Sequence, residues 1–376
     1  MRVWEVDPRV TLPVLRGHTR YVYPVAYSPD GHWIASGGWD NKVRMWDALT
    51  GEQCAKLRHP GVVEALAFAP DSSWLVTGCR ADNRLRVWDP ATGRTRAEFN
   101  APDEPRALAV SPDGARIAAR DLRGNLIILD SATGREVAAA VLGSRGPKWP
   151  LAYSPDGRLL ATHLSGETIA LWDTQTHGVV ARFAGHTGTV YSAAFSPDGR
   201  QLVTAGADRT VRVWEVDTGE CRTLHGHTDE VFTAVFHPGG TRIASAGQDR
   251  AVWVWDVATG KEVARLPGHR AYVWSLAFSP DGKTLVSGSG DKTVRLWDTT
   301  PLKTRYEARR EAAALRPEAD RLVEQLWREK NAPAEVVKAL RADPALSEPL
   351  RQAALRAVLR RALPPEAAPD NPNDLP

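Results

Sequence analysis

Histidine, serine or threonine, and aspartate recur together along this sequence, and a hydrolase could combine these side chains as base, nucleophile and orienting carboxylate. Five sets are present, each closed by a tryptophan six residues after the aspartate: His18/Ser36/Asp40/Trp46, His59/Thr77/Asp82/Trp88, His186/Thr204/Asp208/Trp214, His227/Ser245/Asp249/Trp255 and His269/Ser287/Asp291/Trp297. An active site is normally single, whereas this pattern occurs five times. We therefore expect a structural role for these sets and no catalytic residue among them.

Motifs for other reactions are missing from the sequence. It contains no phosphate-binding loop of glycines and lysine, no kinase catalytic loop, no nucleophile elbow and no zinc-ligand spacing. Cys54, Cys79 and Cys221 lie far apart, which suits a reducing compartment. The sequence therefore predicts a protein that is not an enzyme and that has no cofactor and no metal site.

Short strands must position the five sets. Within residues 268–298, apolar and polar residues alternate over 272–278, 284–287 and 293–297, as they do in half-buried strands. A Ser-Pro-Asp-Gly turn joins the first two runs. Three short strands cannot bury both of their faces, so this unit needs further copies of itself.

Six more copies are present in phase. The third strand ends at Trp46, Trp88, Leu129, Trp172, Trp214, Trp255 and Trp297, and consecutive ends are 41 to 43 residues apart. A Gly-His pair begins four of the copies, and His59 takes its place in the second. A period of about 40 to 45 residues from Gly-His to Trp-Asp is typical of a four-stranded propeller blade.

These repeats closely resemble those of the WD-repeat family, over roughly residues 10–298. The resemblance implies an all-β fold: a seven-bladed β-propeller of four-stranded antiparallel blades, with a small C-terminal α-helical appendage. It also implies that each His/Ser-or-Thr/Asp/Trp set forms a buried hydrogen-bonded chain across its blade, and we call these sets staples. Similar helical tails follow WD repeats in some bacterial multidomain proteins, so we expect a bacterial-type member.

The N-terminal residues begin inside a repeat, because residues 2–7 match residues 212–217. Residues 10–15 have the pattern of an outer strand, which the last copy lacks. In similar proteins the N-terminal outer strand completes the last blade and so removes an exposed sheet edge. We expect a propeller over residues 1–299 that is closed by residues 10–15; a truncated eighth blade is the alternative.

After the propeller the periodicity becomes helical. Residues 300–363 predict a helical extension with helices over 306–315, 317–330, 333–341 and 347–363, in which Pro317 and Pro333 suit first-turn positions. Residues 364–376 have a composition typical of a disordered tail.

The third and fourth copies depart from the pattern. Leu129 replaces the tryptophan of the third copy, and Gly166 replaces the aspartate of the fourth. Their strands still alternate, so we expect both blades to form, with weaker loops.

Charge and hydropathy restrict the partners. The net charge is +3, which provides no strongly basic field to attract nucleic acid. The first residues contain no apolar signal core, and no apolar run approaches the length of a membrane span. We expect a cytoplasmic protein without nucleic-acid or membrane partners, either monomeric or part of a larger complex.

Aromatic residues mark a candidate binding rim. The resemblance places the residue six before each turn proline at the rim of the central channel, where partners dock in the family. These residues are Tyr23, Glu64, Arg106, Trp149, Tyr191, Phe232 and Trp274. Tyr21, Trp39 and Tyr272 are expected beside them. We predict that the eight aromatic residues bind a protein or peptide, because aromatic anchors are typical of interfaces; packing between blades is the alternative for each.

The predicted function is that of a non-enzymatic protein- or peptide-binding scaffold. The alternative is the sensor or regulatory portion of a signalling enzyme, such as a bacterial serine/threonine kinase, whose catalytic domain lies upstream or on another chain. An enzyme that uses the propeller channel is the third possibility, and no isolated acid, base or metal cluster supports it.

Overall fold

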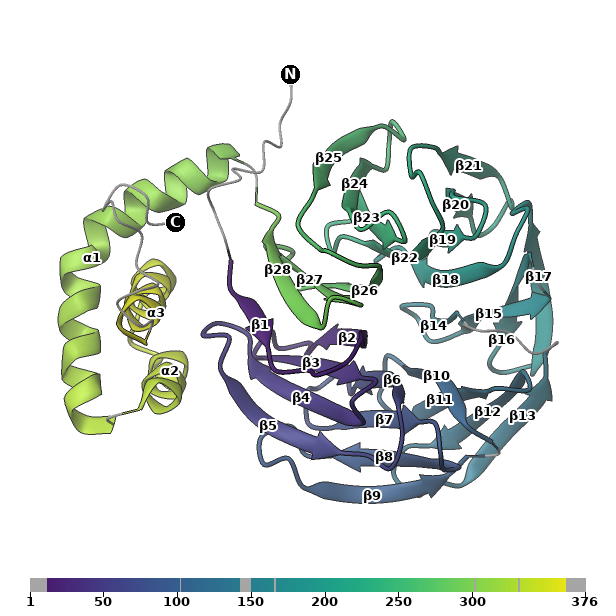
Figure 1. Ribbon diagram of the computed structural model, residues 1–376, viewed down its shortest axis with the longest axis horizontal. Helices are drawn as coiled ribbons and strands as arrows, with labels where there is room; N and C mark the ends of the chain where they lie inside the picture. Colours follow the sequence, from purple (N-terminus) through teal and green to yellow (C-terminus); the bar gives the residue numbers. More distant parts are fainter. Residues whose placement is uncertain are drawn as a thin grey trace.

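The protein forms a ring of blades in a computed structural model, which describes residues 12–101, 103–142, 150–165, 167–300, 302–330 and 332–362. Within these ranges, seven four-stranded antiparallel sheets stand around a common centre, and three helices follow the last sheet (Figure 1). The predicted fold class, a seven-bladed propeller with a helical appendage, is confirmed.

Blades 1 to 6 each consist of four strands that are consecutive in the chain. Their bounds are, for blade 1, β2 (Val22–Tyr27), β3 (Trp33–Gly38), β4 (Lys42–Asp47) and β5 (Gln53–Arg58); for blade 2, β6 (Val63–Phe68), β7 (Leu75–Cys79), β8 (Arg84–Trp88) and β9 (Thr95–Asn100); for blade 3, β10 (Pro105–Val110), β11 (Arg116–Asp121), β12 (Asn125–Asp130) and β13 (Glu136–Val141). They are, for blade 4, β14 (Leu151–Tyr153), β15 (Leu159–Ser165), β16 (Thr168–Asp173) and β17 (Gly178–Ala184); for blade 5, β18 (Val190–Phe195), β19 (Gln201–Gly206), β20 (Val211–Glu215) and β21 (Cys221–Leu224); for blade 6, β22 (Val231–Phe236), β23 (Arg242–Gly247), β24 (Val252–Asp256) and β25 (Glu262–Leu266). The first strand of each blade lies innermost and the fourth outermost (Figure 1).

Blade 7 takes its outer strand from the other end of the chain. It consists of β26 (Val273–Phe278), β27 (Thr284–Ser289), β28 (Thr293–Asp298) and β1 (Val14–Arg16). β1 pairs antiparallel with β28, so that Leu15 lies opposite Val294. Of the expected strand residues that the structure describes, Leu12 and Pro13 lie outside β1, and Pro13 has no N–H for the ladder. Residues 1–11, including the repeat-like residues 2–7, lie outside the described part of the chain.

The hydrophobic core lies between neighbouring blades. Side chains alternate between the two faces of a strand, and each face of a blade is covered by the adjacent blade. Leu85 and Phe99 of blade 2, for example, pack in one cluster with Ile117 and Leu129 of blade 3. Leu129 is buried in the place that tryptophan takes in the other blades. Apolar packing therefore forms blade 3 although that blade has no staple.

The helical appendage has a small core of its own. α1 (Leu302–Lys330), α2 (Pro333–Ala342) and α3 (Glu348–Ala362) pack through residues that include Val323, Val336 and Val358. Helices over 306–315 and 317–330 were expected to be separate, but α1 runs through both, and Pro317 lies inside it. None of the described helices is both long and apolar enough to cross a membrane.

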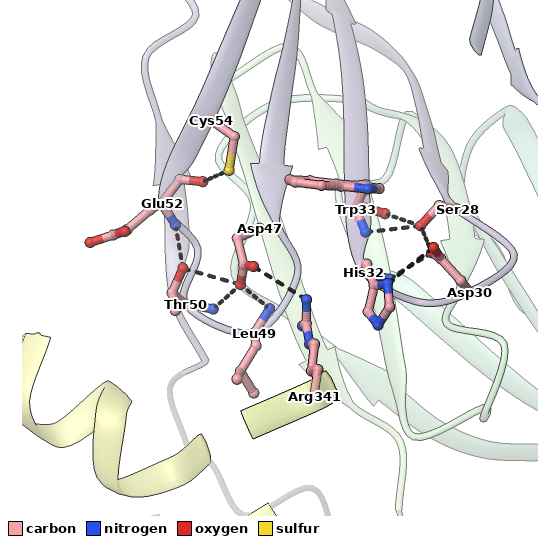
Figure 2. A network of polar contacts seen from close by, with 10 residues as sticks. All are labelled: Ser28, Asp30, His32, Trp33, Asp47, Leu49, Thr50, Glu52, Cys54 and Arg341. Atoms are coloured by element: carbon pink, nitrogen blue, oxygen red, sulfur yellow. Dashed lines mark hydrogen bonds and ion pairs between the residues drawn. The ribbon is translucent and has the colours of Figure 1, made fainter. Parts of the chain in front are cut away.

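The appendage contacts blade 1 at the turn after β4. Leu49 packs against the helical core, and Arg341 of α2 donates a hydrogen bond to Asp47 at 3.5 Å (Figure 2). In blades 3 and 6 the equivalent aspartate pairs with an arginine of its own blade, as Arg116 does with Asp130 in blade 3. In blade 1 the guanidinium comes from the appendage instead, which fastens α2 to the ring.

Candidate functional site

In the five blades that carry a staple sequence, two loops lie on one face of the ring, which we call the rim face. One loop precedes the innermost strand and carries the staple histidine, and the other joins the second and third strands and carries the staple aspartate. In blade 1 the two loops are in contact, since the Trp39 N–H donates to the Tyr21 carbonyl at 2.9 Å. Residues of both loops therefore share one surface.

The structure brings seven of the eight predicted aromatic residues into one row across blades 5, 6, 7 and 1. Ring centroids are 5.4 Å apart for Tyr191 and Phe232, 4.6 Å for Phe232 and Trp274, 5.8 Å for Tyr272 and Trp274, 5.9 Å for Tyr23 and Trp274, and 5.2 Å for Tyr21 and Trp39. A Cβ built on Gly290 would lie 3.5 Å from Trp274 and 3.7 Å from Tyr21, so these two rings flank the same glycine. We call these seven residues the aromatic row; Trp149 lies outside the described residues.

Members of the aromatic row differ in how much of each ring solvent reaches. Tyr21 and Tyr272 are each 43% exposed, whereas Phe232 is only 6% exposed and stacks on Trp274. The other members are half-buried. Phe232 therefore supports its neighbours by packing, and the two exposed tyrosines are the members that a partner reaches first.

Glu64 and Arg106, the polar members of the predicted rim, belong to a buried ionic cluster. Glu64 is 4% exposed and forms ion pairs with Arg80 and Arg106. Burial, and after it the negative charge of Glu64, raise the pKa of Tyr23 above its usual range, so its hydroxyl stays protonated. Arg80 also lies over the ring of Trp39, 5.4 Å from the centroid. These charges consequently stabilise the wall of the channel and present no open acidic surface.

Four of the five staples have the predicted connectivity. The histidine Nδ1 lies against the aspartate at 3.0, 2.9, 2.7 and 2.8 Å for His18–Asp40, His186–Asp208, His227–Asp249 and His269–Asp291. The Nε2 atoms lie 2.9, 2.8, 2.7 and 2.7 Å from the hydroxyls of Ser36, Thr204, Ser245 and Ser287. Trp46, Trp214, Trp255 and Trp297 donate to the same hydroxyls at 2.8, 2.9, 2.7 and 2.8 Å.

The chemistry of each group fixes the direction of these hydrogen bonds. Indole can only donate, and an ionised carboxylate can only accept. A neutral histidine therefore donates from Nδ1 to the aspartate, and its Nε2 accepts from the hydroxyl. The serine and threonine residues of the staples are 0% exposed, so no substrate reaches their oxygens. This arrangement can link strands, but it cannot present a nucleophile; its contribution to stability stays a prediction.

The staple of blade 2 lacks its predicted aspartate contact. His59 and Trp88 share the Thr77 hydroxyl as in the other sets, but Asp82 pairs with Arg86 instead. Between the hydroxyl residue and the aspartate this turn has one residue more than the others, and Ala81 within it has a φ of 98°. The longer turn moves the Asp82 carboxylate away from the imidazole of His59. The Nδ1 atom of His59 is buried and has no hydrogen-bond partner among the described residues.

Because His59 is buried without this carboxylate contact, we predict that the free energy of unfolding falls as the pH is lowered. Burial, and then the charge of Arg86, lower the pKa of His59 from 6.5 to about 4. Between these values the unfolded chain binds a proton that the folded chain does not, so stability falls as the pH falls through this window. The loss at about pH 5.5 is about 1.4 kcal/mol. Urea unfolding near neutral pH and at about pH 5.5 measures it, and His59→Gln should remove that part of the pH dependence. Identical pH dependence in both proteins would contradict the assignment.

The sequence-based prediction missed a group of basic residues on the rim face. Arg20, Arg209, Arg250, Arg270 and Lys292 are all exposed, and all lie in the two kinds of rim loop of blades 5, 6, 7 and 1. We call them the rim cations. The net charge of +3 gave no sign of these residues, because it is a sum over the whole chain and does not show where charges lie on the surface. The signal that could have revealed them is position, since three of them directly follow a staple aspartate.

Comparison with known proteins identifies the family. The model of the WD domain, G-beta repeat, matches residues 9–47, 51–89, 178–215, 219–256 and 260–298, which together make up more than half of the chain. The protein belongs to the WD-repeat family. The WD-repeat matches leave out the third and fourth copies, which lack the staple pattern, although blades 3 and 4 are formed in the structure.

Curated WD-repeat relatives match over short segments. Small ribosomal subunit protein RACK1z of Arabidopsis thaliana is 48% identical over 61 residues, 16% of this chain and 19% of that protein. Cross-pathway control WD-repeat protein 2 of Flammulina velutipes is 37% identical over 75 residues, 20% of this chain and 24% of that protein. Actin-interacting protein 1 of Drosophila melanogaster is 40% identical over 83 residues, 21% of this chain and 14% of that protein. The matches span a quarter or less of each relative. These three organisms are eukaryotes, so the relatives give no support to the expected bacterial type.

Proposed function

We propose that this WD-repeat protein is a non-enzymatic scaffold that binds a protein or peptide on its rim face, at blades 5, 6, 7 and 1. The observation that carries the proposal is the aromatic row, in which Tyr21 and Tyr272 are each 43% exposed while neighbouring rings hold them by contact. Aromatic side chains that are fixed on one side and open on the other are effective anchors, because binding orders them at little entropic cost.

Two further observations favour binding over catalysis. The staple hydroxyls, which are the candidate nucleophiles, are completely buried. Two of the relatives also carry names that refer to a macromolecular partner, the small ribosomal subunit and actin. A scaffold that associates with other macromolecules is the function that suits both the buried staples and these names.

The proposed assembly is a monomer or one subunit of a larger complex, located in the cytoplasm. β1 completes blade 7 within the same chain, so the ring needs no second copy for closure. The rim face therefore remains available to a partner of a different kind.

A second candidate function is the regulatory portion of a signalling enzyme, such as a bacterial serine/threonine kinase with its catalytic domain upstream or on another chain. The observation that favours it is the appendage, which the Arg341–Asp47 contact fastens to blade 1 as a second module. Reading the gene upstream of Met1 tests this function: a kinase domain in the same frame supports it, and a stop codon directly upstream removes the version with an upstream domain.

Loss of the two exposed tyrosines should abolish binding on the rim face. Truncation of an aromatic anchor typically costs about 2 kcal/mol or more in binding, roughly 30-fold in affinity. Peptides selected on the wild-type protein from a random display library are the probe. The double variant Tyr21→Ala with Tyr272→Ala should lose their binding, measured by titration, while its melting temperature changes little because neither side chain belongs to the buried core.

A matched control removes exposed apolar side chains elsewhere. Val141 of β13 and Val180 of β17 are 79% and 56% exposed on outer strands. The double variant Val141→Ala with Val180→Ala should keep the affinity for the selected peptides. If the valine variant loses the peptides and the tyrosine variant keeps them, the binding face is wrong.

A further inference from the structure

The rim cations surround the exposed part of the aromatic row. Arg20 directly precedes Tyr21, and Arg270 lies two residues before Tyr272. Arg209, Arg250 and Lys292 follow the staple aspartates of blades 5, 6 and 7. All five side chains are exposed, and none of them forms an ion pair with another described residue. The aromatic row is thus bordered by positive charge that the protein does not itself neutralise.

The other side of the same face is different, because its charges are paired. In blades 2 and 3, Arg80 and Arg106 pair with Glu64, and Arg123 pairs with Asp103. Arg84 pairs with Glu98 of the neighbouring outer strand. The rim cations, which form no ion pair with another described residue, thus lie on the part of the rim face that carries exposed aromatic rings, whereas these four arginines of blades 2 and 3 are paired within the chain.

The backbone of three rim cations adds a second argument. Arg209, Arg250 and Lys292 have φ values of 65°, 67° and 72°, a left-handed conformation that favours glycine or asparagine. Blade 1 has Asn41 at the same position, with a φ of 62°. These three long basic side chains form no ion pair with another described residue despite their strained backbone, so their charge is free for a contact outside the chain.

We infer that the partner of the rim face is an acidic peptide segment, whose aspartate and glutamate side chains pair with the rim cations while an apolar residue packs against Tyr21 and Tyr272. This inference rests on the proposed function and adds the chemistry of the partner. The complementary charge would steer the segment onto the face and fix its register, and the aromatic rings would supply most of the affinity.

The geometry favours a peptide over a single-stranded nucleic acid. Nucleic acids also combine cations with aromatic rings, but their bases stack on free ring faces. Here Phe232 and Trp274 stack on each other with an interplanar angle of 10°, and Phe232 is buried, so that face is already occupied. Glu230, which accepts a hydrogen bond from Tyr191 at 2.9 Å, places a carboxylate beside the row. A nucleic acid carries a negative charge at every nucleotide and so would meet this carboxylate, whereas a peptide with acidic side chains elsewhere can place backbone N–H groups or an uncharged residue there.

Charge reversal tests the inference with the same random peptide library as probe. Peptides enriched on the wild-type protein should contain more aspartate and glutamate than the unselected library. The triple variant Arg209→Glu, Arg250→Glu and Lys292→Glu should bind them about tenfold or more weakly, because three exposed ion pairs become repulsive. The affinity for the wild-type protein should also fall as salt is added.

The matched control reverses three exposed charges on the opposite face. Arg135, Arg200 and Lys261 lie in the turns at the other ends of the strands, and Arg135→Glu, Arg200→Glu and Lys261→Glu give the same net charge as the first triple variant. This control should bind the selected peptides like the wild-type protein, and melting curves of both variants check that each is folded.

The possible outcomes separate this inference from the proposed function. Selected peptides without an acidic excess, or with unchanged affinity for the rim triple variant, would overturn the inference; if Tyr21→Ala with Tyr272→Ala still abolished binding, the scaffold function would remain. If the selected peptides bind the Tyr21→Ala, Tyr272→Ala variant as tightly as the wild-type protein, the proposed binding face is wrong. Binding of an oligouridine RNA, together with no binding of acidic peptides, would assign the rim cations to nucleic acid and overturn the inference.

Discussion

Replacing Leu15 by aspartate is expected to open the ring and to lower the free energy of unfolding by about 3 kcal/mol or more. Leu15 is 4% exposed and packs in one cluster with residues of blades 1 and 7, including Ile34 and Val294. Among the described residues, three pairs join β1 to β28, so this short strand depends on the Leu15 side chain for its position. Without β1, β28 becomes a free sheet edge that can pair with another molecule. Urea unfolding should show the loss, and size-exclusion chromatography should show aggregation.

The adjacent residue provides the control for ring closure. Arg16 lies in the same strand but is exposed, because successive side chains point to opposite faces. Arg16→Asp introduces the same side chain and should change the stability by no more than about 0.5 kcal/mol. A Leu15→Asp protein that stays monomeric and unfolds like the wild type would show that β1 does not hold the ring closed.

Replacing Asp208 by alanine should lower the free energy of unfolding by about 2–3 kcal/mol. Asp208 accepts hydrogen bonds from His186 at 2.9 Å and from Thr210 at 2.7 Å. Burial alone would raise the pKa of this carboxyl, but the hydrogen bonds from His186 and Thr210 outweigh burial and hold the pKa well below its usual range. The alanine variant leaves His186, which is 3% exposed, without its acceptor. Thermal and urea unfolding measure the effect, while the affinity for rim-face peptides should hardly change.

Asp82→Ala is the matched change in blade 2. Asp82 pairs with Arg86 and not with His59, and its side chain is 24% exposed. Arg86 keeps a second partner in Glu98, so the variant should lose less than about 1 kcal/mol. Equal losses for Asp208→Ala and Asp82→Ala would mean that the histidine–aspartate contact contributes nothing specific to the staple.

The sequence alone determined the fold, because the fold is encoded in a repeated local pattern. Alternating strands, Ser-Pro-Asp-Gly turns and a spacing of 41 to 43 residues each predict the same blade, and seven copies in phase predict the ring. The same regularity predicted the partners of the staples in four blades, where the turn between hydroxyl and aspartate has a constant length. Blade 2 broke the prediction at Asp82, since one additional residue in a turn moves a side chain without changing the pattern of the strands.

Only the tertiary structure decided which of the rim residues are exposed, which are buried and which charges are paired. The aromatic row joins residues of four blades, and the contact of Tyr23 with Trp274 joins residues from the two ends of the propeller sequence. Burial of Phe232 beside exposure of Tyr272 depends on contacts between neighbouring blades. The pairing of Glu64 with Arg106 and the unpaired state of the rim cations are likewise properties of the closed ring. Pro317 shows the same limit in the appendage, where packing against α3 accompanies one continuous helix α1 in place of two. Local pattern fixes strands and turns, whereas exposure and charge pairing depend on which distant residues the fold places side by side.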